Sequence, residues 1–282
     1  MFIIYGINME HKLTPLQAKL LESLKWFDAF CKEHNLRYYA IGGTMLGALR
    51  HEGFIPWDDD IDLGMPRRDF EKLKEFAKTE KGRFQFEFYD SEADDFYYPF
   101  TKLYDTSTTL VEHKRKDVVR GVYIDLFPLD GIGNTKEEGL GNYRKFKKYN
   151  MLFETMVDGV RTGRAWYKNA AIVLCGFIPK FILNPRNLRI KLNEICSKYD
   201  YAQCKFGGNF FGAYWEREIV DLSLLGTPKY YKFEDMMLAG PENADGYLTR
   251  IYKDWRKLPP KEKQVSHHDF VYLDLNKGYL DK

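Results

Sequence analysis

Apolar residues recur every three or four positions near the start of the chain, which is the spacing that places side chains on one face of a helix. The recurring residues are Leu20, Leu24, Phe27 and Cys31. Thr14 precedes a proline, a residue favoured at the first helical position, and Gln17 stands where a capping box requires it. The pattern predicts a helix over residues 15–34.

A strand, a glycine turn and a short helix are expected next. The run LRYYAI, residues 36–41, is rich in aromatic and branched side chains and is typical of a strand. It leads directly into Gly42 and Gly43, and TMLGALR, residues 44–50, has the composition of a helix. The glycines therefore precede the start of a predicted helix.

Polar and apolar residues alternate in the next strand. Ile61 and Leu63 alternate with Asp60 and Asp62, which is the period of a strand with one buried face. A helix is expected to follow from Pro66 to a stop at Gly82.

Shorter strand-like runs fill the middle of the chain, and a largely helical part follows them. The runs are residues 84–89, 100–104, 108–112 and 122–127. From about 135 to 200 the pattern is mostly helical. We therefore expect an α+β fold, with a mixed sheet flanked by helices, in a single domain over 1–282 that contains a helical insertion at about 135–200.

Composition limits the classes of protein that the chain can represent. Its 282 residues are 44% hydrophobic and 16% aromatic, enough for a packed core, and its net charge of +2 is too small for a nucleic-acid binder. Its four cysteines show no Cys-x-x-Cys spacing, which favours a reducing compartment such as the cytoplasm. The longest apolar stretch, residues 170–183, is too short to span a membrane.

Four carboxylates stand within five residues, flanked by apolar side chains. They are Asp58, Asp59, Asp60 and Asp62. In a strand, Asp60 and Asp62 project from the same face. Carboxylates that converge in this way need a counter-charge, and a hard divalent cation such as Mg²⁺ or Mn²⁺ is the usual one.

Two other interpretations of the acidic run deserve comparison with a metal site. A calcium loop of the EF-hand type would need glycine at its sixth place and glutamate at its twelfth, where this chain has Leu63 and Asp69. A solvated acidic loop remains open, because short acidic motifs alone are weak signals. The upstream glycines favour the metal site, since Gly42 and Gly43 allow close backbone approach and the N–H groups of the next helix suit a phosphate.

The order of these motifs resembles a known family. GGT followed by DID resembles the signature of the nucleotidyltransferase fold shared with DNA polymerase beta. The longer string YAIGGTMLGALRHEGFIPWDDDIDLGM is similar to the LicD family of phosphocholine transferases, which is related to fukutin. FTKLYD from Phe100, VYIDLFPLDGI from Val122 and YKDWRKLPPKEKQ near the C-terminus extend the resemblance. One departure is Lys253, where similar proteins commonly have glycine in a Tyr-Gly-Asp sequence.

The resemblance implies a third carboxylate from a later strand. Asp125 suits this role because it alternates with Ile124 and Leu126 on a predicted strand. The alternative is an aspartate that caps a turn before Pro128. The predicted catalytic residues and metal ligands are Asp60, Asp62 and Asp125.

The family also implies an activity. It would be metal-dependent transfer of phosphocholine from CDP-choline to a sugar hydroxyl of a cell-surface glycan precursor, of teichoic acid or lipopolysaccharide type, with release of CMP. Asp125 would accept the proton of the hydroxyl. Three alternatives stay open: transfer of another alcohol phosphate (ethanolamine, ribitol or glycerol) from its CDP donor, a nucleotide-sugar glycosyltransferase, and a non-enzymatic metal-binding membrane adaptor.

Further residues are candidates for substrate binding. Lys102 and Arg50 would contact phosphate, and Trp57 would face the choline, whose quaternary ammonium favours aromatic rings. Each also has an ordinary structural interpretation, as a surface cation or a core side chain. The full predicted set is Gly42, Gly43, Thr44, Arg50, Trp57, Lys102, His267 and His268.

A basic, apolar segment bears on location. Arg161, Arg164 and Lys168 precede the apolar run, and Arg186 and Lys191 follow it. Such a helical stretch can lie in an anionic membrane interface, which would suit a lipid-linked acceptor. The alternative is a buried helix with solvated neighbours. We expect a cytoplasmic protein, either free or peripheral at the inner face of the membrane through about 160–191.

Overall fold

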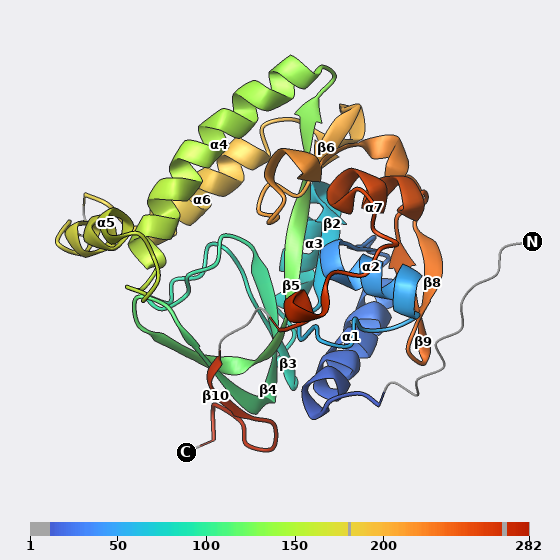
Figure 1. Ribbon diagram of the computed structural model, residues 1–282, viewed down its shortest axis with the longest axis horizontal. Helices are drawn as coiled ribbons and strands as arrows, with labels where there is room; N and C mark the ends of the chain where they lie inside the picture. Colours follow the sequence, from blue (N-terminus) through green and yellow to red (C-terminus); the bar gives the residue numbers. More distant parts are fainter. Residues whose placement is uncertain (1–11, 180–181, 267–269, 282) are drawn as a thin grey trace, which may run out of the picture.

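The chain folds into a mixed β-sheet with helices on its faces (Figure 1). The structure, a computed structural model, describes residues 12–179, 182–266 and 270–281. Within the described residues the main sheet has eight strands, with β1-β2-β5-β4-β10 as its central path. β3 pairs with β4, β6 pairs with β5, and β7 pairs with β6. The main-sheet strands are β1 (Tyr39–Ala40), β2 (Asp62–Pro66), β3 (Phe84–Glu87), β4 (Thr101–His113), β5 (Asp117–Gly133), β6 (Phe206–Gly208), β7 (Ile219–Asp221) and β10 (Phe270–Asp274).

The helices pack on this sheet or extend from it. They are α1 (Pro15–Glu33), α2 (Gly42–His51), α3 (Arg67–Ala77), α4 (Lys136–Val157), α5 (Trp166–Gly176), α6 (Pro185–Cys196) and α7 (Ala244–Tyr252). A separate two-stranded sheet pairs β8 (Lys229–Phe233) with β9 (Met236–Gly240). The predicted α+β class is therefore confirmed.

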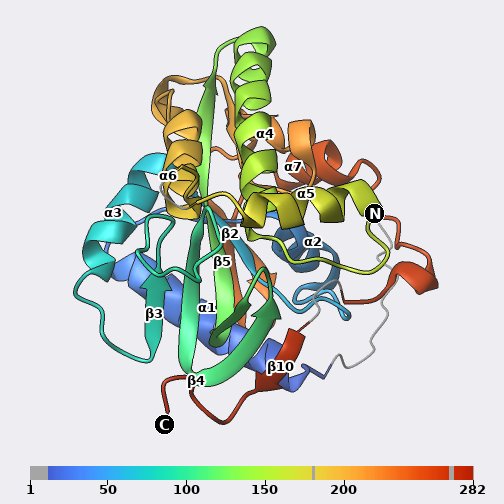
Figure 2. The same ribbon diagram turned by 90° about the vertical axis from the view of Figure 1, so that its left-hand side faces the viewer.

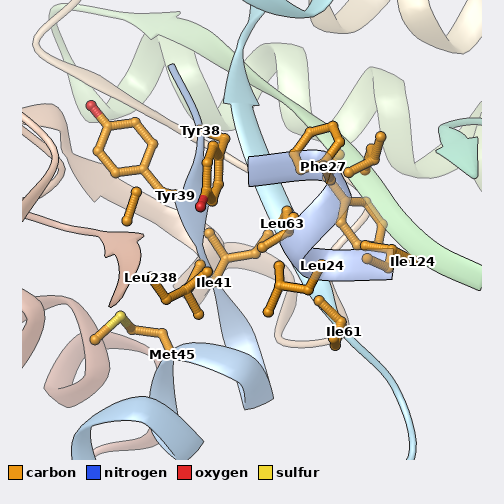
Figure 3. Packing of buried hydrophobic residues seen from close by; sticks show 14 of the residues in the cluster. Leu24, Phe27, Tyr38, Tyr39, Ile41, Met45, Ile61, Leu63, Ile124 and Leu238 are labelled. Atoms are coloured by element: carbon orange, nitrogen blue, oxygen red, sulfur yellow. The ribbon is translucent and has the colours of Figure 1, made fainter. Parts of the chain in front are cut away.

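The first helix begins as the sequence predicted. Thr14 accepts a hydrogen bond from the Gln17 backbone, and the Gln17 side chain accepts one from the Thr14 backbone, so both halves of the capping box are present. Leu24 and Phe27 of α1 are fully buried. They meet Leu63 of β2 and side chains of β1 and β5 in the main core (Figure 3).

The predicted glycine turn is instead the first turn of a helix. α2 begins at Gly42, with Gly43 as its second residue. Gly42 has a φ of +52°, a conformation that suits glycine because it lacks a Cβ atom. The preceding strand, β1, is shorter than the predicted 36–41, since only Tyr39 and Ala40 pair with β2.

The helix expected to stop at Gly82 ends at Ala77. The N–H groups of Lys78, Thr79 and Glu80 donate to carbonyls three residues earlier. Such bonds tighten the end of a helix into a 3₁₀-like turn, so α3 finishes before the glycine.

Two runs predicted as separate strands, 100–104 and 108–112, belong to the single long strand β4. It pairs antiparallel with β5, and the register shifts between Asp105 and Leu110, so the bulge keeps both runs in one ladder. Gly121 of β5 lies at this bulge, where a Cβ atom would stand 1.9 Å from the Asp105 carbonyl oxygen. The close approach of the two backbones requires glycine there.

The helical part after β5 forms a second, smaller core. α4 and α6 lie side by side in both views, and α5 extends from the end of α4 (Figures 1 and 2). Phe146, Phe153 and Leu192 are buried between these helices. The helices occupy the predicted range of about 135–200. No helix among the described residues is both long and apolar enough to cross a membrane.

Candidate functional site

Two of the predicted aspartates stand side by side on the sheet. β2 runs parallel to β5 with Asp62 paired to Asp125, and β4 runs antiparallel to β5 with Lys102 paired to Asp125. Residues in register on neighbouring strands project from the same face of a sheet. Asp62, Asp125 and Lys102 therefore form a row across three strands.

Asp125 is held by a buried lysine. Its Oδ1 atom lies 2.8 Å from Lys102 Nζ, and the exposed fractions of the two side chains are 15% and 1%. Lys102 Nζ also lies 3.1 Å from the ring centroid of Tyr123 and 4.1 Å from that of Tyr98. Burial raises the pKa of Asp125 to about 6, although the charge and the hydrogen bond of Lys102 lower it.

Negative charge accumulates around Asp62. Burial raises its pKa well above the usual range, and the carboxylates of Asp60, Asp125 and Asp58 raise it further, in that order. These carboxylates therefore repel one another. A cation placed among them would be stabilised by the same charges.

The glycine-rich start of α2 is hydrogen-bonded to Asp62, the first residue of β2. The Asp62 N–H donates to Thr44 Oγ1 at 2.8 Å. A Cβ atom on Gly42 would lie 3.2 Å from Asp62 Oδ2, and the Gly42 N–H donates to the hydroxyl of Tyr247 at 3.3 Å. The GGT and DID motifs are thus adjacent in space, as the sequence suggested.

Asp58 lies against the second glycine. A Cβ atom on Gly43 would stand 2.8 Å from Asp58 Oδ2. A phosphate at this helix start would therefore meet a carboxylate as well as N–H groups. The predicted phosphate cradle of Gly42, Gly43 and Thr44 stays a prediction, and it requires a cation between the two anions.

The oxygen donors of the acidic residues suit a hard divalent cation by their chemistry. Among the described residues, however, no group of three or more His, Cys, Asp or Glu side chains is placed to hold a metal ion. Asp125 points toward Lys102 instead, at 2.8 Å. Coordination by Asp60, Asp62 and Asp125 together therefore stays a prediction.

Other predicted residues have structural contacts of their own. Arg50 donates from Nε to His51 at 3.0 Å and from Nη1 to the Trp255 carbonyl at 3.2 Å. Trp57 is half-buried, with its ring centroid 6.3 Å from that of His51. The roles of Arg50 and Trp57 in substrate binding stay predictions. His267 and His268 lie outside the described residues.

Sequence reasoning missed residues that come from distant segments. Tyr247 of α7 binds Gly42 although 205 positions separate them. Glu218 is buried, and burial raises its pKa to about 7 against the opposing effects of the Tyr214 N–H and of Arg217. The negative charge of Glu218 raises the pKa of Asp62 further. No local pattern identifies such residues, because only the tertiary fold brings them to the acids.

A cavity of about 280 Å³ opens beside Asp125, between the sheet and the C-terminal half of α4. We refer to it as the aromatic pocket. Its lining is Tyr97, Tyr98, Pro99, Phe100, Lys102, Glu112, Lys114, Tyr123, Asp125, Asn150, Phe153, Glu154, Val157, Asp158 and Phe211. A larger cavity of about 400 Å³ lies near the start of α4, and its lining includes none of the predicted site residues.

Comparison with known proteins finds a family with a similar sequence. Residues 35–156 match the family model described as LicD/FKTN/FKRP, nucleotidyltransferase domain. Residues 35–156 are therefore similar to the LicD family. The matched segment runs from just before β1 to the last turn of α4, and it includes Asp60, Asp62 and Asp125.

The relatives of this chain include named transferases. The chain is 28% identical over 268 residues to "Lipopolysaccharide cholinephosphotransferase LicD" of Haemophilus influenzae, covering 91% of this chain and 97% of the relative. It is 36% identical over 76 residues to human "Ribitol 5-phosphate transferase FKRP", covering 26% of this chain and 15% of the relative. A shorter match, 49% identical over 37 residues, covers 13% of this chain and 14% of "Uncharacterized protein RP689" of Rickettsia prowazekii.

Proposed function

We propose that this chain transfers phosphocholine from CDP-choline to a sugar hydroxyl of a cell-surface glycan precursor, of teichoic acid or lipopolysaccharide type, and releases CMP. The observation that supports this best is the register of Asp62 beside Asp125, next to a glycine-rich helix start. The relatives bear the names of phosphotransferases, and the chain is an enzyme of that class.

The proposal includes a divalent cation, Mg²⁺ or Mn²⁺, held by Asp60, Asp62 and Asp125. When bound, such a cation would neutralise charge on the diphosphate of the donor. The mutual repulsion of these carboxylates supports a cation at this place. Asp58 beside Gly43 supports it too, since a diphosphate would otherwise approach an uncompensated carboxylate.

Asp125 would act as the general base. The acceptor hydroxyl would transfer its proton to a carboxylate oxygen of Asp125 as it attacks the phosphorus. Lys102 fixes the orientation of that carboxylate through their contact of 2.8 Å. Because the pKa of Asp125 is about 6, the group would be ionised at neutral pH and still be a stronger base than an ordinary aspartate.

Transfer of another alcohol phosphate is the second candidate. The similarity to a protein named as a ribitol 5-phosphate transferase favours it, because the same motifs would serve any CDP-alcohol. The match to that relative spans only 76 residues, whereas the match to the cholinephosphotransferase spans 268. Choline is therefore the preferred donor head group.

The proposal also includes a lipid-linked acceptor and peripheral contact with a membrane through about 160–191. Large apolar side chains of this segment face solvent: Val160, Trp166, Tyr167, Val173, Leu174, Phe177 and Ile182. Trp166 and Phe177 are each 80% exposed. The sequence from 159 to 193 contains arginine and lysine but no acidic residue. Exposed aromatic and basic side chains together suit an anionic lipid surface.

The function is tested by incubating the protein with CDP-choline, CDP-ethanolamine, CDP-glycerol and CDP-ribitol in the presence of Mg²⁺. CMP release would be followed with and without candidate glycan acceptors. We expect CDP-choline to be used best and Asp62→Asn to abolish release. CMP release from a CDP-polyol alone would favour the second candidate, and release from none of the donors would contradict both.

A further inference from the structure

The aromatic pocket combines ring faces with an excess of negative charge. Its lining contains four carboxylates, Asp125, Glu112, Glu154 and Asp158, against the two ammonium groups of Lys102 and Lys114. A pocket of this composition is better suited to a cationic group than to an anion.

Most of these charges already have partners. Glu112 accepts hydrogen bonds from the hydroxyls of Tyr98 and Tyr123. Asp158 pairs with Arg164 at 2.8 Å. Glu154 is exposed on α4, where its carboxylate accepts from Asn150 Nδ2 at 2.8 Å. Glu154 is therefore the lining carboxylate most accessible to a further cation.

Two lysines already face rings of this pocket. Lys114 Nζ lies 5.5 Å from the ring centroid of Tyr98. Lys102 Nζ lies 3.1 Å from the ring centroid of Tyr123, 4.1 Å from that of Tyr98 and 5.8 Å from that of Phe100. The remaining aromatic lining, Tyr97, Phe153 and Phe211, lies on the side of the second core. Cation–π attraction needs such a ring face within about 6 Å of the positive centre.

The size of the pocket also limits what can enter it. A cavity of about 280 Å³ is at or below the small end of the usual range for ligand pockets, roughly 300–1,000 Å³. It can accept a head group but not a whole nucleotide diphosphate. Because Asp125 is part of the lining, a head group seated here would have its phosphate beside the predicted metal ligands.

We propose that the aromatic pocket binds the quaternary ammonium of the donor, between the Phe211 face and the Glu154 carboxylate, and so selects choline over uncharged alcohols. This inference rests on the proposed function. A trimethylammonium group cannot donate hydrogen bonds, so ring faces and a carboxylate recognise it well. A polyol would instead need hydrogen-bond partners, and the hydroxyls of Tyr98 and Tyr123 are already engaged with Glu112.

Two variants test the pocket without disturbing the aspartates. Glu154→Gln removes the accessible charge and keeps the size of the side chain, and Phe211→Leu removes a ring face but keeps an apolar group. Glu137→Gln is the matched control, because Glu137 is exposed on the first turn of the same helix and is absent from the pocket lining. Thermal unfolding of each variant establishes that it is folded.

The readouts are kcat/KM for CDP-choline and CDP-ribitol, and phosphocholine binding by calorimetry. Either pocket variant should lower kcat/KM for CDP-choline about tenfold and weaken phosphocholine binding to a similar extent. Turnover of CDP-ribitol should change less than about twofold, as should every value for the control.

The outcomes separate this inference from the proposed function. If the unaltered protein uses CDP-choline but neither pocket variant changes its preference for choline over ribitol, the pocket assignment is wrong and the function stands. Equal losses of kcat/KM with CDP-choline and CDP-ribitol would also overturn the pocket assignment, because the residues would then contact a group that both donors share. If the unaltered protein uses no CDP-alcohol, the proposed function itself fails.

Discussion

Asp62 of β2 lies directly beside Asp125 of β5, in register across a pair of parallel strands. Parallel strands must be joined by a crossover, so this relationship brings together aspartates that are far apart in the sequence. The hydroxyl of Thr44 accepts from the Asp62 N–H and joins the glycine-rich helix start to the same strand. The acids, the helix start and Lys102 thus become one site through the pairing of three strands.

Glu218 should make stability depend on pH. Its pKa is raised by burial from 4.5 to about 7, so the folded state favours the protonated acid. The resulting stability is fully present below about pH 4.5 and is lost as the pH rises through 7. At pH 8, Glu218→Gln should therefore be more stable than the unaltered protein by up to about 3 kcal/mol.

Urea unfolding at pH 5 and pH 8 measures this difference. The gap between Glu218→Gln and the unaltered protein should narrow at the lower pH. Glu216→Gln, which changes an exposed neighbour, should show no such trend. A gap of the same size at both pH values would mean that Glu218 does not titrate as described.

Lys253 adopts a backbone conformation better suited to glycine. It follows α7 with a φ of +66° and a ψ of −108°, a region that residues with a Cβ atom rarely adopt. Lys253→Gly should relieve the strain and stabilise the protein by about 1 kcal/mol. Lys257→Gly, at a position without positive φ, should instead be neutral or destabilising. The midpoint of thermal unfolding of each variant, compared with that of the unaltered protein, measures the change in stability. A loss of stability in Lys253→Gly would contradict the account.

The exposed face of α5 should bind anionic lipid. We expect the protein to float with vesicles that contain phosphatidylglycerol, and to float less as salt screens its basic residues. Replacing both Trp166 and Phe177 with serine should abolish flotation, because each side chain is 80% exposed and free to enter the interface.

A matched double variant controls for the loss of apolar surface. Tyr230 and Val271 are 55% and 58% exposed on other elements, and replacing both with serine should leave flotation unchanged. CMP release from CDP-choline with a water-soluble acceptor should be the same in both double variants. Absence of flotation at low salt, or equal losses in the two variants, would reject this membrane face.

Local patterns in the sequence predicted the elements that depend on local chemistry. The capping box at Thr14 and Gln17 predicted α1. The alternation of Asp60 and Asp62 with apolar residues predicted a strand that holds both acids, but β2 begins at Asp62 and Asp60 precedes it. The sequence did not predict that α3 ends at Ala77 or that β4 is one continuous strand. A tightened final turn and a bulge opposite Gly121 decide these features, and neither leaves a distinct local pattern.

Contacts between distant segments were predicted only where a family resemblance supplied them. Asp125 was selected in that way, and the strand pairing places it beside Asp62. The contact of Tyr247 with Gly42 and the burial of Glu218 depend on how α7 and the segment before β7 fold back over the site. The ion pair of Lys102 with Asp125 was missed because it follows from strand register, which single-sequence patterns specify poorly.

Calorimetric titration with Mn²⁺ tests the central claim most directly, because it measures binding by the acids and not turnover. The unaltered protein should bind Mn²⁺, and Asp62→Asn and Asp125→Asn should each weaken binding at least about tenfold. Asp59→Asn, which alters a neighbouring acid that receives a hydrogen bond from Ser266, should bind normally. Equal Mn²⁺ affinity in the unaltered protein and in Asp62→Asn would contradict the account.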